Sequence, residues 1–377
     1  MGTCQKSSYS VPSMEEIRNM KGNGYNVIST FSGGGGSSTG YRMAGYKVLW
    51  ANEFVEAAQD TYNANKGDHT ILDTRDIRNV SPESILKATG LKKGELDLFD
   101  GSPPCASFSA VGSREKGWGK VKKYSDTKQR TDDLFFEYAR LLKGLQPKTF
   151  VAENVLGLIH GTAKGYFKMI LRELKSCGYR VKAAALDASL LGVPQTRGRL
   201  IFVGVREDLG LDPVFPKPHR KRITVGEALK GVVNSEEELT ILRTEVLSRK
   251  SSNGTPKWGK ILSMIPKNPP KVIEGDKVVG PNSYFGLKRL SFMKPSQAIL
   301  AGNGVGGAAG ACHPVEDRRM SIPEIRRICA FPDDYILTGN LGQQWERMGR
   351  SVPPLMMREI SKTVQTEILD KLRDGNT

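Results

Sequence analysis

Short apolar segments that end at polar residues constrain the fold of this chain more than any other feature. The segments that read as buried strands are residues 27–31, 46–51, 96–99, 149–152, 180–186 and 200–205. Residues 132–145 and 167–177 lie between them and have the apolar spacing of helices. Strands that alternate with helices predict an α/β fold with a mostly parallel, Rossmann-like sheet, in which ligands bind beyond the carboxyl ends of the strands.

The pattern changes after residue 205. Residues 206–320 show few periodic segments and many Pro, Gly, Lys and Arg residues. Helix signals return at Ser321, which has Glu324 three residues later as in a capping box, and a last helix is expected over 353–373. We therefore predict four parts, namely an N-terminal extension (1–24), a main domain (25–205), a smaller irregular domain (206–320) and a segment that returns to the main domain (321–377).

The charge of the chain points to a polyanionic partner. It has 56 Lys and Arg against 40 Asp and Glu residues, a net charge of +16 and a pI near 9.6. A merely basic soluble protein is the plainer alternative. No apolar run is long enough to span a membrane and the start of the chain has no signal-peptide pattern, so we expect a cytoplasmic protein. The five cysteines form no Cys-x-x-Cys pair, so neither a disulfide framework nor a metal site is expected.

A glycine-rich stretch, residues 33–36, follows the first strand. Glycines before a helix let the backbone approach a nucleotide-like ligand closely, although such a stretch is often only a turn. Glu53 ends the second strand about twenty residues later, where an acidic side chain can accept ribose hydroxyls. Asp76 could accept the adenine amino group, or it could be a solvated loop carboxylate. The glycine spacing departs from the dinucleotide pattern, which favours an adenosyl cofactor over NAD.

Cys105 stands in the sequence Gly-Ser-Pro-Pro-Cys, directly after the third strand. An isolated cysteine is usually a small buried hydrophobic residue. Here two prolines precede it and a polar loop follows it, so we interpret it as an exposed nucleophile, since the thiolate is reactive even when sparsely populated.

An acid and two arginines complete this set. Glu153 ends an apolar strand, so it should lie at the edge of a pocket, where partial burial would let it donate a proton. A structural carboxylate paired with arginine is the alternative. Arg197 and Arg199 stand before the strand 200–205. We assign Arg199 to the pocket, where it could hold a ring carbonyl, and allow Arg197 a role in catalysis, packing or phosphate contact.

Together these motifs resemble those of the DNA (cytosine-5) methyltransferase family. The shared elements are Phe31-Ser32-Gly33, Glu53, Pro103-Pro104-Cys105, Glu153-Asn154-Val155, residues 195–199, residues 321–335 and residues 349–354. The resemblance covers roughly residues 25–205 and 286–372. Any one element could arise by chance, but this set in this order is distinctive.

The resemblance implies the methyltransferase variant of the α/β fold, S-adenosylmethionine as donor, and a cytosine flipped out of double-stranded DNA as acceptor. In such an enzyme Cys105 adds to C6, Glu153 donates to N3 and Arg199 holds O2. It implies a target-recognition role for residues 206–320. The implied donor-binding residues are Phe31, Ser32, Gly33, Gly35, Ser37, Thr39, Glu53, Phe54, Asp76, Ile77, Pro103, Arg350, Ser351 and Val352. The candidates for DNA contact are Ser107, Ser109, Lys217, Arg220, Lys221 and Arg222, of which the basic residues could equally form a solvated loop.

Arg350 departs from the family, which usually has asparagine after the glycine of the last motif. A guanidinium about 4 Å from the cationic sulfonium would oppose it by roughly 4 kcal/mol at an effective dielectric of 20. Arginine binds carboxylates well, which raises the hypothesis of a carboxy-S-adenosylmethionine donor and a 5-carboxymethylcytosine product. The alternative is that Arg350 contacts DNA phosphate or an acidic neighbour. Ala106 is a lesser departure, since glutamine is frequent there.

Three other interpretations remain open at this point. An RNA cytosine-5 methyltransferase would share the fold and the charge, although the sizeable irregular region favours duplex DNA. A DNA-binding protein without activity is disfavoured because Cys105, Glu153 and Arg199 are all present. A small-molecule methyltransferase would not need the basic second region. We expect a monomer acting in a bacterial or phage-infected cell, with or without a restriction partner.

Overall fold

The computed structural model describes residues 9–104, 122–124, 127–129, 133–248, 258–279, 287–303 and 310–375. The chain forms two compact units. The sheet unit comprises Glu15–Asp187, Gly198–Pro218 and Pro354–Thr377. The second unit comprises Met1–Met14, Ala188–Arg197 and His219–Pro353.

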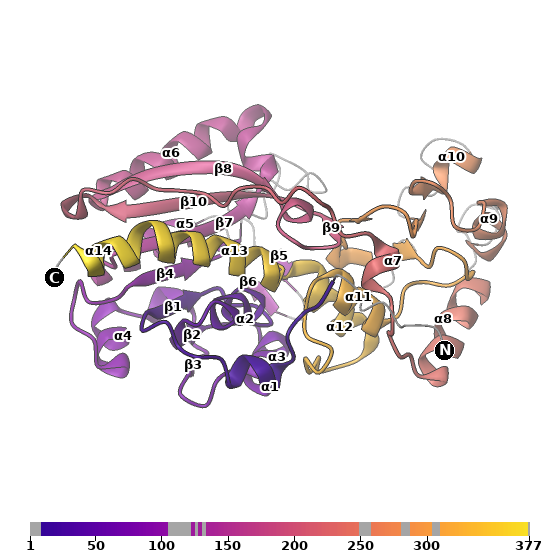
Figure 1. Ribbon diagram of the computed structural model, residues 1–377, viewed down its shortest axis with the longest axis horizontal. Coiled ribbons are helices and arrows are strands. Elements are labelled where there is room, and N and C mark those ends of the chain that lie inside the picture. Colours follow the sequence, from indigo (N-terminus) through magenta and orange to yellow (C-terminus); the bar gives the residue numbers. More distant parts are fainter. Residues whose placement is uncertain are drawn as a thin grey trace. The chain divides into compact units, whose positions relative to one another are not determined.

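A seven-stranded sheet is the centre of the sheet unit, with the order β3-β2-β1-β4-β7-β10-β8 (Figure 1). The strands are β1 (Asn26–Thr30), β2 (Lys47–Asn52), β3 (Ile71–Asp73), β4 (Leu98–Gly101), β7 (Thr149–Val155), β8 (Tyr179–Asp187) and β10 (Gly198–Arg206). Strands β3, β2, β1, β4 and β7 pair in parallel, whereas β10 is antiparallel to both β7 and β8. A separate antiparallel pair is formed by β5 (Lys122–Tyr124) and β6 (Thr127–Gln129).

Helices pack on both faces of this sheet, whose strands β1, β4, β7 and β10 are largely buried. The helices are α1 (Met14–Arg18), α2 (Gly36–Met43), α3 (Glu56–Asn65), α4 (Pro82–Thr89), α5 (Leu134–Leu145), α6 (Lys164–Ser176), α13 (Pro354–Val364) and α14 (Asp370–Asp374). Buried residues of α4, α5 and α6 form one core with Ile28, Phe99, Phe150 and Phe202 of the sheet. Helix α13, yellow in Figure 1, packs against α2, and its Ser361 carbonyl accepts a hydrogen bond from Tyr46.

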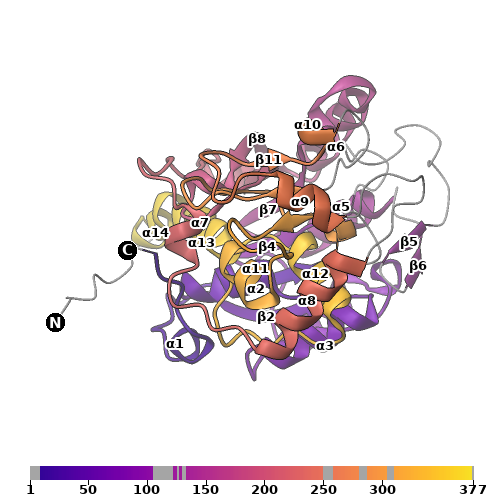
Figure 2. The same cartoon turned by 90° about the vertical axis from the view of Figure 1, so that its right-hand side faces the viewer.

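The second unit is made of short elements. Its described helices, which Figure 2 shows, are α7 (Val225–Ala228), α8 (Glu236–Ser248), α9 (Trp258–Met264), α10 (Asp276–Val279), α11 (Ile322–Ile328) and α12 (Leu341–Arg350). Its strands are β9 (Gln195–Thr196), β11 (Ile273–Glu274), β12 (Lys288–Arg289), β13 (Ser296–Gln297) and β14 (Ala311–Cys312). Strand β12 joins β11 and β14 in one small sheet, and β9 pairs with β13.

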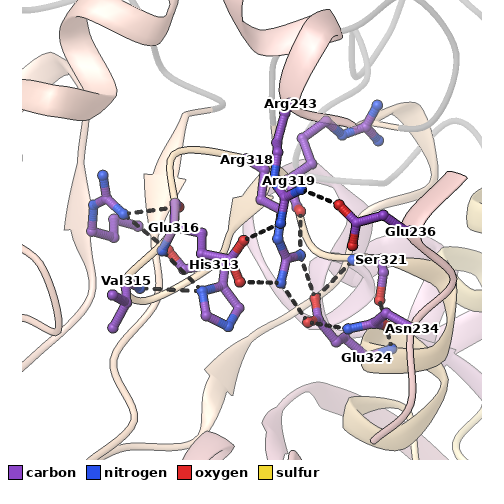
Figure 3. Close-up of polar contacts among 11 residues, drawn as sticks. Asn234, Glu236, Arg243, His313, Val315, Glu316, Arg318, Arg319, Ser321 and Glu324 are labelled. Carbon is purple, nitrogen blue, oxygen red and sulfur yellow. Dashed lines mark hydrogen bonds and ion pairs between the residues drawn. The ribbon is translucent and has the colours of Figure 1, made fainter. Parts of the chain in front are cut away.

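Buried ion pairs hold part of the second unit together (Figure 3). Arg318 is 1% exposed and donates to both carboxylate oxygens of Glu324, at 2.9 and 2.7 Å. Its guanidinium also contacts Glu316 at 3.1 Å. Glu324 completes the capping box that begins α11, because Ser321 and Glu324 bond each other's backbone N–H. The buried charge is therefore paired and tied to the start of a helix, as a charge out of water must be.

The expected fold class is confirmed, and so is the capping box at Ser321. The compact units divide the chain at other points than 205 and 320. Residues 188–197 and 321–353 belong to the second unit, and 206–218 to the sheet unit. The roles given to the four predicted parts remain predictions. Among the helices of the described residues, none has the length and apolar character needed to cross a lipid bilayer.

Candidate active site

The predicted site residues of the sheet unit follow strands whose carboxyl ends share one edge of the sheet. Thr30, at the end of β1, pairs with Asn52 of β2 on one side and with Gly101 of β4 on the other. Gly101 in turn pairs with Ala152 of β7. Parallel pairing therefore brings residues 31–36, 53–54 and 102–104, which follow β1, β2 and β4, to the same edge as residues 153–154 near the end of β7.

The segment after β1 is a turn with left-handed backbone at three positions. Gly33 and Gly35 have φ angles of 54° and 90°, which glycine adopts without strain. Phe31 has φ of 54°, which is unusual for a residue with a side chain and is typical of strained positions at ligand sites. The space around the missing Cβ of Gly33 is open to 4 Å. The turn therefore leaves room beside its backbone, directly before the N-terminus of α2.

Three polar side chains of this turn and helix are buried. Ser32, Ser37 and Thr39 are 8%, 5% and 0% exposed. The hydroxyl of Thr39 donates to the carbonyl of Gly35 at 2.8 Å. Thr39 thus stabilises the turn itself, while Phe31 and Gly33 are half-buried at its surface.

Glu53 closes the turn from the neighbouring strand. Its Oε2 accepts the backbone N–H of Gly33 at 2.7 Å, and its Oε1 accepts that of Val55 at 2.7 Å. Each carboxylate oxygen has a second lone pair, so Glu53 can still accept ligand hydroxyls. The next residue, Phe54, is half-buried. The acid therefore fixes the glycine turn and borders the open space beside it.

Asp76 follows β3, the neighbour of β2. It caps the short helical turn Ile77–Asn79 and accepts the backbone N–H of Arg78 at 3.0 Å. It also pairs with the Arg78 guanidinium at 2.9 Å, and the Asp76 side chain is 26% exposed. Ile77 is buried. Capping and ion pairing therefore hold Asp76 in place, and its role toward the adenine remains a prediction.

The segment after β4 leads to the predicted nucleophile. The Pro103 carbonyl accepts from Asn154 at 3.3 Å, and the Ser102 N–H donates to the Thr30 carbonyl at 3.4 Å. A Cβ at Gly101 would lie 2.5 Å from the Tyr138 ring, so only glycine fits there. The described residues end at Pro104. Cys105, Ser107 and Ser109 lie outside them, so their predicted roles remain predictions.

Glu153 and Arg199 lie on adjacent antiparallel strands and pair directly. Arg199 Nε is 2.6 Å from Glu153 Oε1, and the two side chains are 16% and 12% exposed. Arg199 also donates to the carbonyl of Gly198 at 2.7 Å. An acid and a guanidinium, both partly accessible, thus stand at the sheet edge beside Pro103. They can face two neighbouring atoms of one planar ring.

Arg197 has a different setting, in the second unit. It is 2% exposed and donates to the carbonyls of Ile299 and Gly349 at 3.1 and 2.9 Å. These bonds join two segments about fifty residues apart in the sequence. They support the packing role among those considered for Arg197.

Arg350, Ser351 and Val352 also belong to the second unit. Arg350 lies 2.6 Å from Glu346, one turn earlier on α12. Ser351 donates to the Arg347 carbonyl and Val352 is buried. An acidic neighbour of Arg350 was the alternative to the carboxylated donor. Glu346, which also lies 3.7 Å from Arg347, is such an acidic neighbour and favours that alternative over the carboxylated donor.

The basic candidates for DNA contact are exposed. Lys217, Arg220, Lys221 and Arg222 form a short surface run. Lys221 pairs with Glu227 at 2.5 Å and lowers the pKa of that carboxyl. The other basic side chains of the run keep a net positive charge there, so a phosphate-binding role remains a prediction.

The sequence reasoning missed a buried polar cluster under this edge. Asp100, one residue before Gly101, is 1% exposed and accepts hydrogen bonds from Ser29 and Tyr41. A carboxylate at the end of an otherwise apolar strand was the available signal. Asn154, next to Glu153, was also not predicted to hold the Pro103 carbonyl.

Comparison with known proteins identifies the family of this arrangement. The profile of the C-5 cytosine-specific DNA methylases matches residues 25–366. The chain belongs to this family. It is a DNA (cytosine-5-)-methyltransferase, and the family's donor is S-adenosylmethionine. The resemblance drawn from the sequence motifs is therefore confirmed.

Individual methylases of the family are similar over nearly their whole length. The type II methyltransferase M1.HphI of Haemophilus parahaemolyticus is 32% identical over 346 residues, which cover 89% of this chain and 86% of that protein. M.NgoFVII of Neisseria gonorrhoeae is 29% identical over 355 residues, with 92% and 88% covered. DNMT2 of Spodoptera frugiperda, solved as a variant, shares the fold with a TM-score of 0.56, 17% identity, and 93% and 99% coverage.

Proposed function

We propose that this DNA cytosine-5 methylase works through a covalent bond between Cys105 and C6 of a flipped cytosine, with Glu153 and Arg199 holding the ring. The observation that supports this most directly is the 2.6 Å pair of Glu153 and Arg199, which stands beside the strand end that leads to Pro103 and Pro104. Glu153, which can donate a proton, and Arg199, which can bind a carbonyl, are thus available at adjacent positions.

The donor-binding residues of the sheet unit fit S-adenosylmethionine. The open space beside Gly33 lies before the N-terminus of α2, where backbone N–H groups favour a negatively charged group such as the donor's carboxylate. Glu53 offers lone pairs for ribose hydroxyls, and Asp76 and Ile77 offer groups for the adenine edge. When bound, the donor supplies the methyl group. Ser351 and Val352 are proposed donor contacts from the resemblance alone.

The protein's own groups carry the covalent steps. Extrusion of the base costs a few kcal/mol. The Cys105 thiolate adds to C6, Glu153 protonates N3, and Arg199 leaves its carboxylate partner to bind O2, which stabilises charge as it forms on the ring. C5 thereby becomes nucleophilic and takes up the methyl group. A base then removes the C5 proton, and Cys105 is eliminated.

Trapping on a fluorinated substrate tests this proposal. DNA that contains 5-fluorocytosine cannot lose the C5 substituent, so the methylase should stay covalently bound to it in the presence of the donor. We expect a denaturation-resistant complex and a modified peptide that contains Cys105. A Cys105→Ser variant should fold and bind the donor but form no complex. A complex that persists in this variant, or maps to Cys177, Cys312 or Cys329, would contradict the assignment.

The proposal also covers the form of the DNA substrate, the oligomeric state and the cellular location. Duplex DNA is the form of substrate that suits the basic run at 217–222, because phosphates provide most of the affinity for a basic surface. We further propose that the protein acts as a monomer in the cytoplasm of a bacterial or phage-infected cell, with residues 206–320 contributing to target recognition. The type II relatives support a setting in restriction and modification.

5-Methylcytosine is the expected product with S-adenosylmethionine, and no modified cytosine is expected with carboxy-S-adenosylmethionine alone, because that donor has no methyl group to transfer. The Arg350 guanidinium already has a carboxylate partner, Glu346 at 2.6 Å, with which a donor carboxylate would have to compete. The measurement is nucleoside mass spectrometry of DNA treated with S-adenosylmethionine or with carboxy-S-adenosylmethionine. Detection of 5-carboxymethylcytosine that disappears in Arg350→Asn would reinstate the carboxylated donor.

A further inference from the structure

Four buried side chains form a connected hydrogen-bond cluster beneath the predicted active site. We call Ser29, Ser32, Tyr41 and Asp100 the Asp100 cluster. Asp100 accepts from Ser29 Oγ at 2.7 Å and from Tyr41 Oη at 3.0 Å. Ser29 Oγ in turn accepts from Ser32 Oγ at 3.1 Å. Asp100, Ser29 and Tyr41 are at most 1% exposed, and Ser32 is 8% exposed.

The Asp100 cluster connects two segments of the predicted active site, namely the glycine turn and the segment before the predicted nucleophile. Ser32 belongs to the glycine turn at the proposed donor site, next to Gly33. Asp100 is followed by Gly101 and by the elbow that leads to the nucleophile. The Asp100 carbonyl also accepts from Thr30 Oγ1 at 3.1 Å, which ties the ends of β1 and β4 together. Hydrogen bonds therefore link Asp100 to both segments, and the Ser32 hydroxyl has the Ser29 carbonyl, at 3.2 Å, as a second acceptor.

Asp100 titrates in the physiological range. Burial raises its pKa to about 7, the hydrogen bonds from Ser29 and Tyr41 act in the opposite direction, and the negative charge of Glu153 on β7 raises it further. Among the described residues, three tyrosines also interact with it, namely Tyr41 on α2, Tyr62 on α3 and Tyr138 on α5. Burial raises the pKa of each, so they stay neutral while Asp100 titrates.

The direction of the hydrogen bonds in the Asp100 cluster depends on whether Asp100 is protonated. An ionised carboxylate is an acceptor only, so it takes the O–H of both Ser29 and Tyr41. Ser29 then has its oxygen lone pairs free for the O–H of Ser32. A protonated Asp100 must itself donate, and one of the two hydroxyls has to turn away or become an acceptor. The oxygen–oxygen distances of 2.7 and 3.0 Å from Asp100 to Ser29 and Tyr41 allow a carboxylate to accept from both hydroxyls.

We propose that Asp100 is a positioning residue for methyl transfer, whose carboxylate form holds the glycine turn and the segment before the nucleophile in their working arrangement. Protonation weakens this hold, and with it the binding of the donor. The inference rests on the proposed function for the location of the donor, but it does not depend on the covalent step.

Calorimetric titration with S-adenosylhomocysteine, the stable product of the donor, tests the proposal between pH 5.5 and 8.5. For the wild-type protein we expect the affinity to rise about five- to tenfold from the acidic to the basic limit, the size of one ordinary hydrogen bond, with a midpoint near pH 7. Asp100→Asn should bind with an affinity that does not change over this range. A flat wild-type profile, or a wild-type profile in Asp100→Asn, overturns the proposal.

Asp97 provides a matched control in the same region of the chain. It is also buried, at 4% exposed, but it lies just before the amino-terminal end of β4, whereas Asp100 lies near the carboxyl end. Asp97 pairs with Lys148 at 2.7 Å. Asp97→Asn should keep the wild-type pH profile even if it lowers stability. The Cys105→Ser protein should keep it too, so a failure of the covalent mechanism remains separate from a failure of this inference.

If the Asp100→Asn protein does not fold, the Tyr41→Phe variant tests the proposal instead. It removes one hydroxyl that holds the pKa of Asp100 down and leaves the aromatic ring in place. The midpoint of the binding profile should then move to higher pH. An unchanged midpoint in a folded Tyr41→Phe protein overturns the proposal.

Discussion

Replacing Glu153 with glutamine is expected to lower kcat by about 10²–10⁴-fold, the range typical of lost general acid catalysis. Glutamine keeps the shape and can still donate an N–H hydrogen bond, but it cannot pass a proton to N3. The loss should appear in the single-turnover methylation rate, because the step that suffers is chemistry. Donor binding, measured by calorimetry, should change much less, since Glu153 belongs to the proposed ring-binding pair and not to the glycine turn.

The control for this prediction lies at the other end of the same strand pair. Arg206, the last residue of β10, pairs with Asp208 at 2.7 Å, and the Asp208 side chain is 60% exposed. Asp208→Asn removes a similar arginine–carboxylate pair far along β10 from Arg199, and it should leave kcat unchanged. If Glu153→Gln methylates at the rate of Asp208→Asn, Glu153 is a structural partner of Arg199 and not an acid.

The edge of the sheet could be predicted from the sequence because its signals are local. Apolar runs of four to seven residues define the strands, Glu53 follows its strand directly, and Glu153 lies near the end of its own strand. Parallel pairing then brings their ends together whatever the details of packing. The contact of Glu153 with Arg199 needs more, since it depends on β10 running antiparallel to β7 in one register. That pairing joins residues about fifty positions apart, and no local pattern specifies it.

The buried polar residues could not be predicted from the sequence, for a different reason. Arg318 and Arg289 are 1% and 0% exposed, although arginine is rarely buried unless it is paired. Their partners become visible only in three dimensions, as with Asp317, 2.5 Å from Arg289. Two-residue strands such as β12 and β14 also carry no periodicity. Asp100 is the same case in the sheet unit, because a carboxylate in a core strand is stable only with the donors of the Asp100 cluster.

Replacing Arg318 with methionine is expected to destabilise the second unit by about 3–5 kcal/mol, because it leaves the buried carboxylate of Glu324 without its charge partner. Glu324 is 3% exposed and caps α11 through the Ser321 N–H, so the damage should reach the start of that helix. The measurement is chemical denaturation followed by tryptophan fluorescence, to which Trp345 of the second unit contributes; Trp345 is 2% exposed and has the Arg319 guanidinium 4.4 Å from its ring centre.

Two further variants separate the loss of a partner from the loss of a charge. Arg243→Ala removes an arginine that is 42% exposed and pairs with Glu236 and Glu316, and it should cost at most about 1 kcal/mol. The double variant Arg318→Met with Glu324→Leu should recover part of the loss of the single variant, since no unpaired charge then stays buried. Equal losses in Arg318→Met and Arg243→Ala would mean that the buried pair adds nothing beyond a surface contact.

The loss of stability caused by Arg318→Met should depend on pH. Burial opposes the charge of Glu324, but the hydrogen bonds and charge of Arg318 lower its pKa in the folded protein. A carboxyl whose folded pKa is depressed contributes stability that is present above its unfolded pKa, about 4.3, and is lost as the pH falls below it. Without Arg318 the buried carboxyl takes up a proton more easily. The difference in stability between wild type and Arg318→Met should therefore be largest near neutral pH and should shrink as the pH falls toward 4, whereas a loss due only to missing side-chain packing would stay constant.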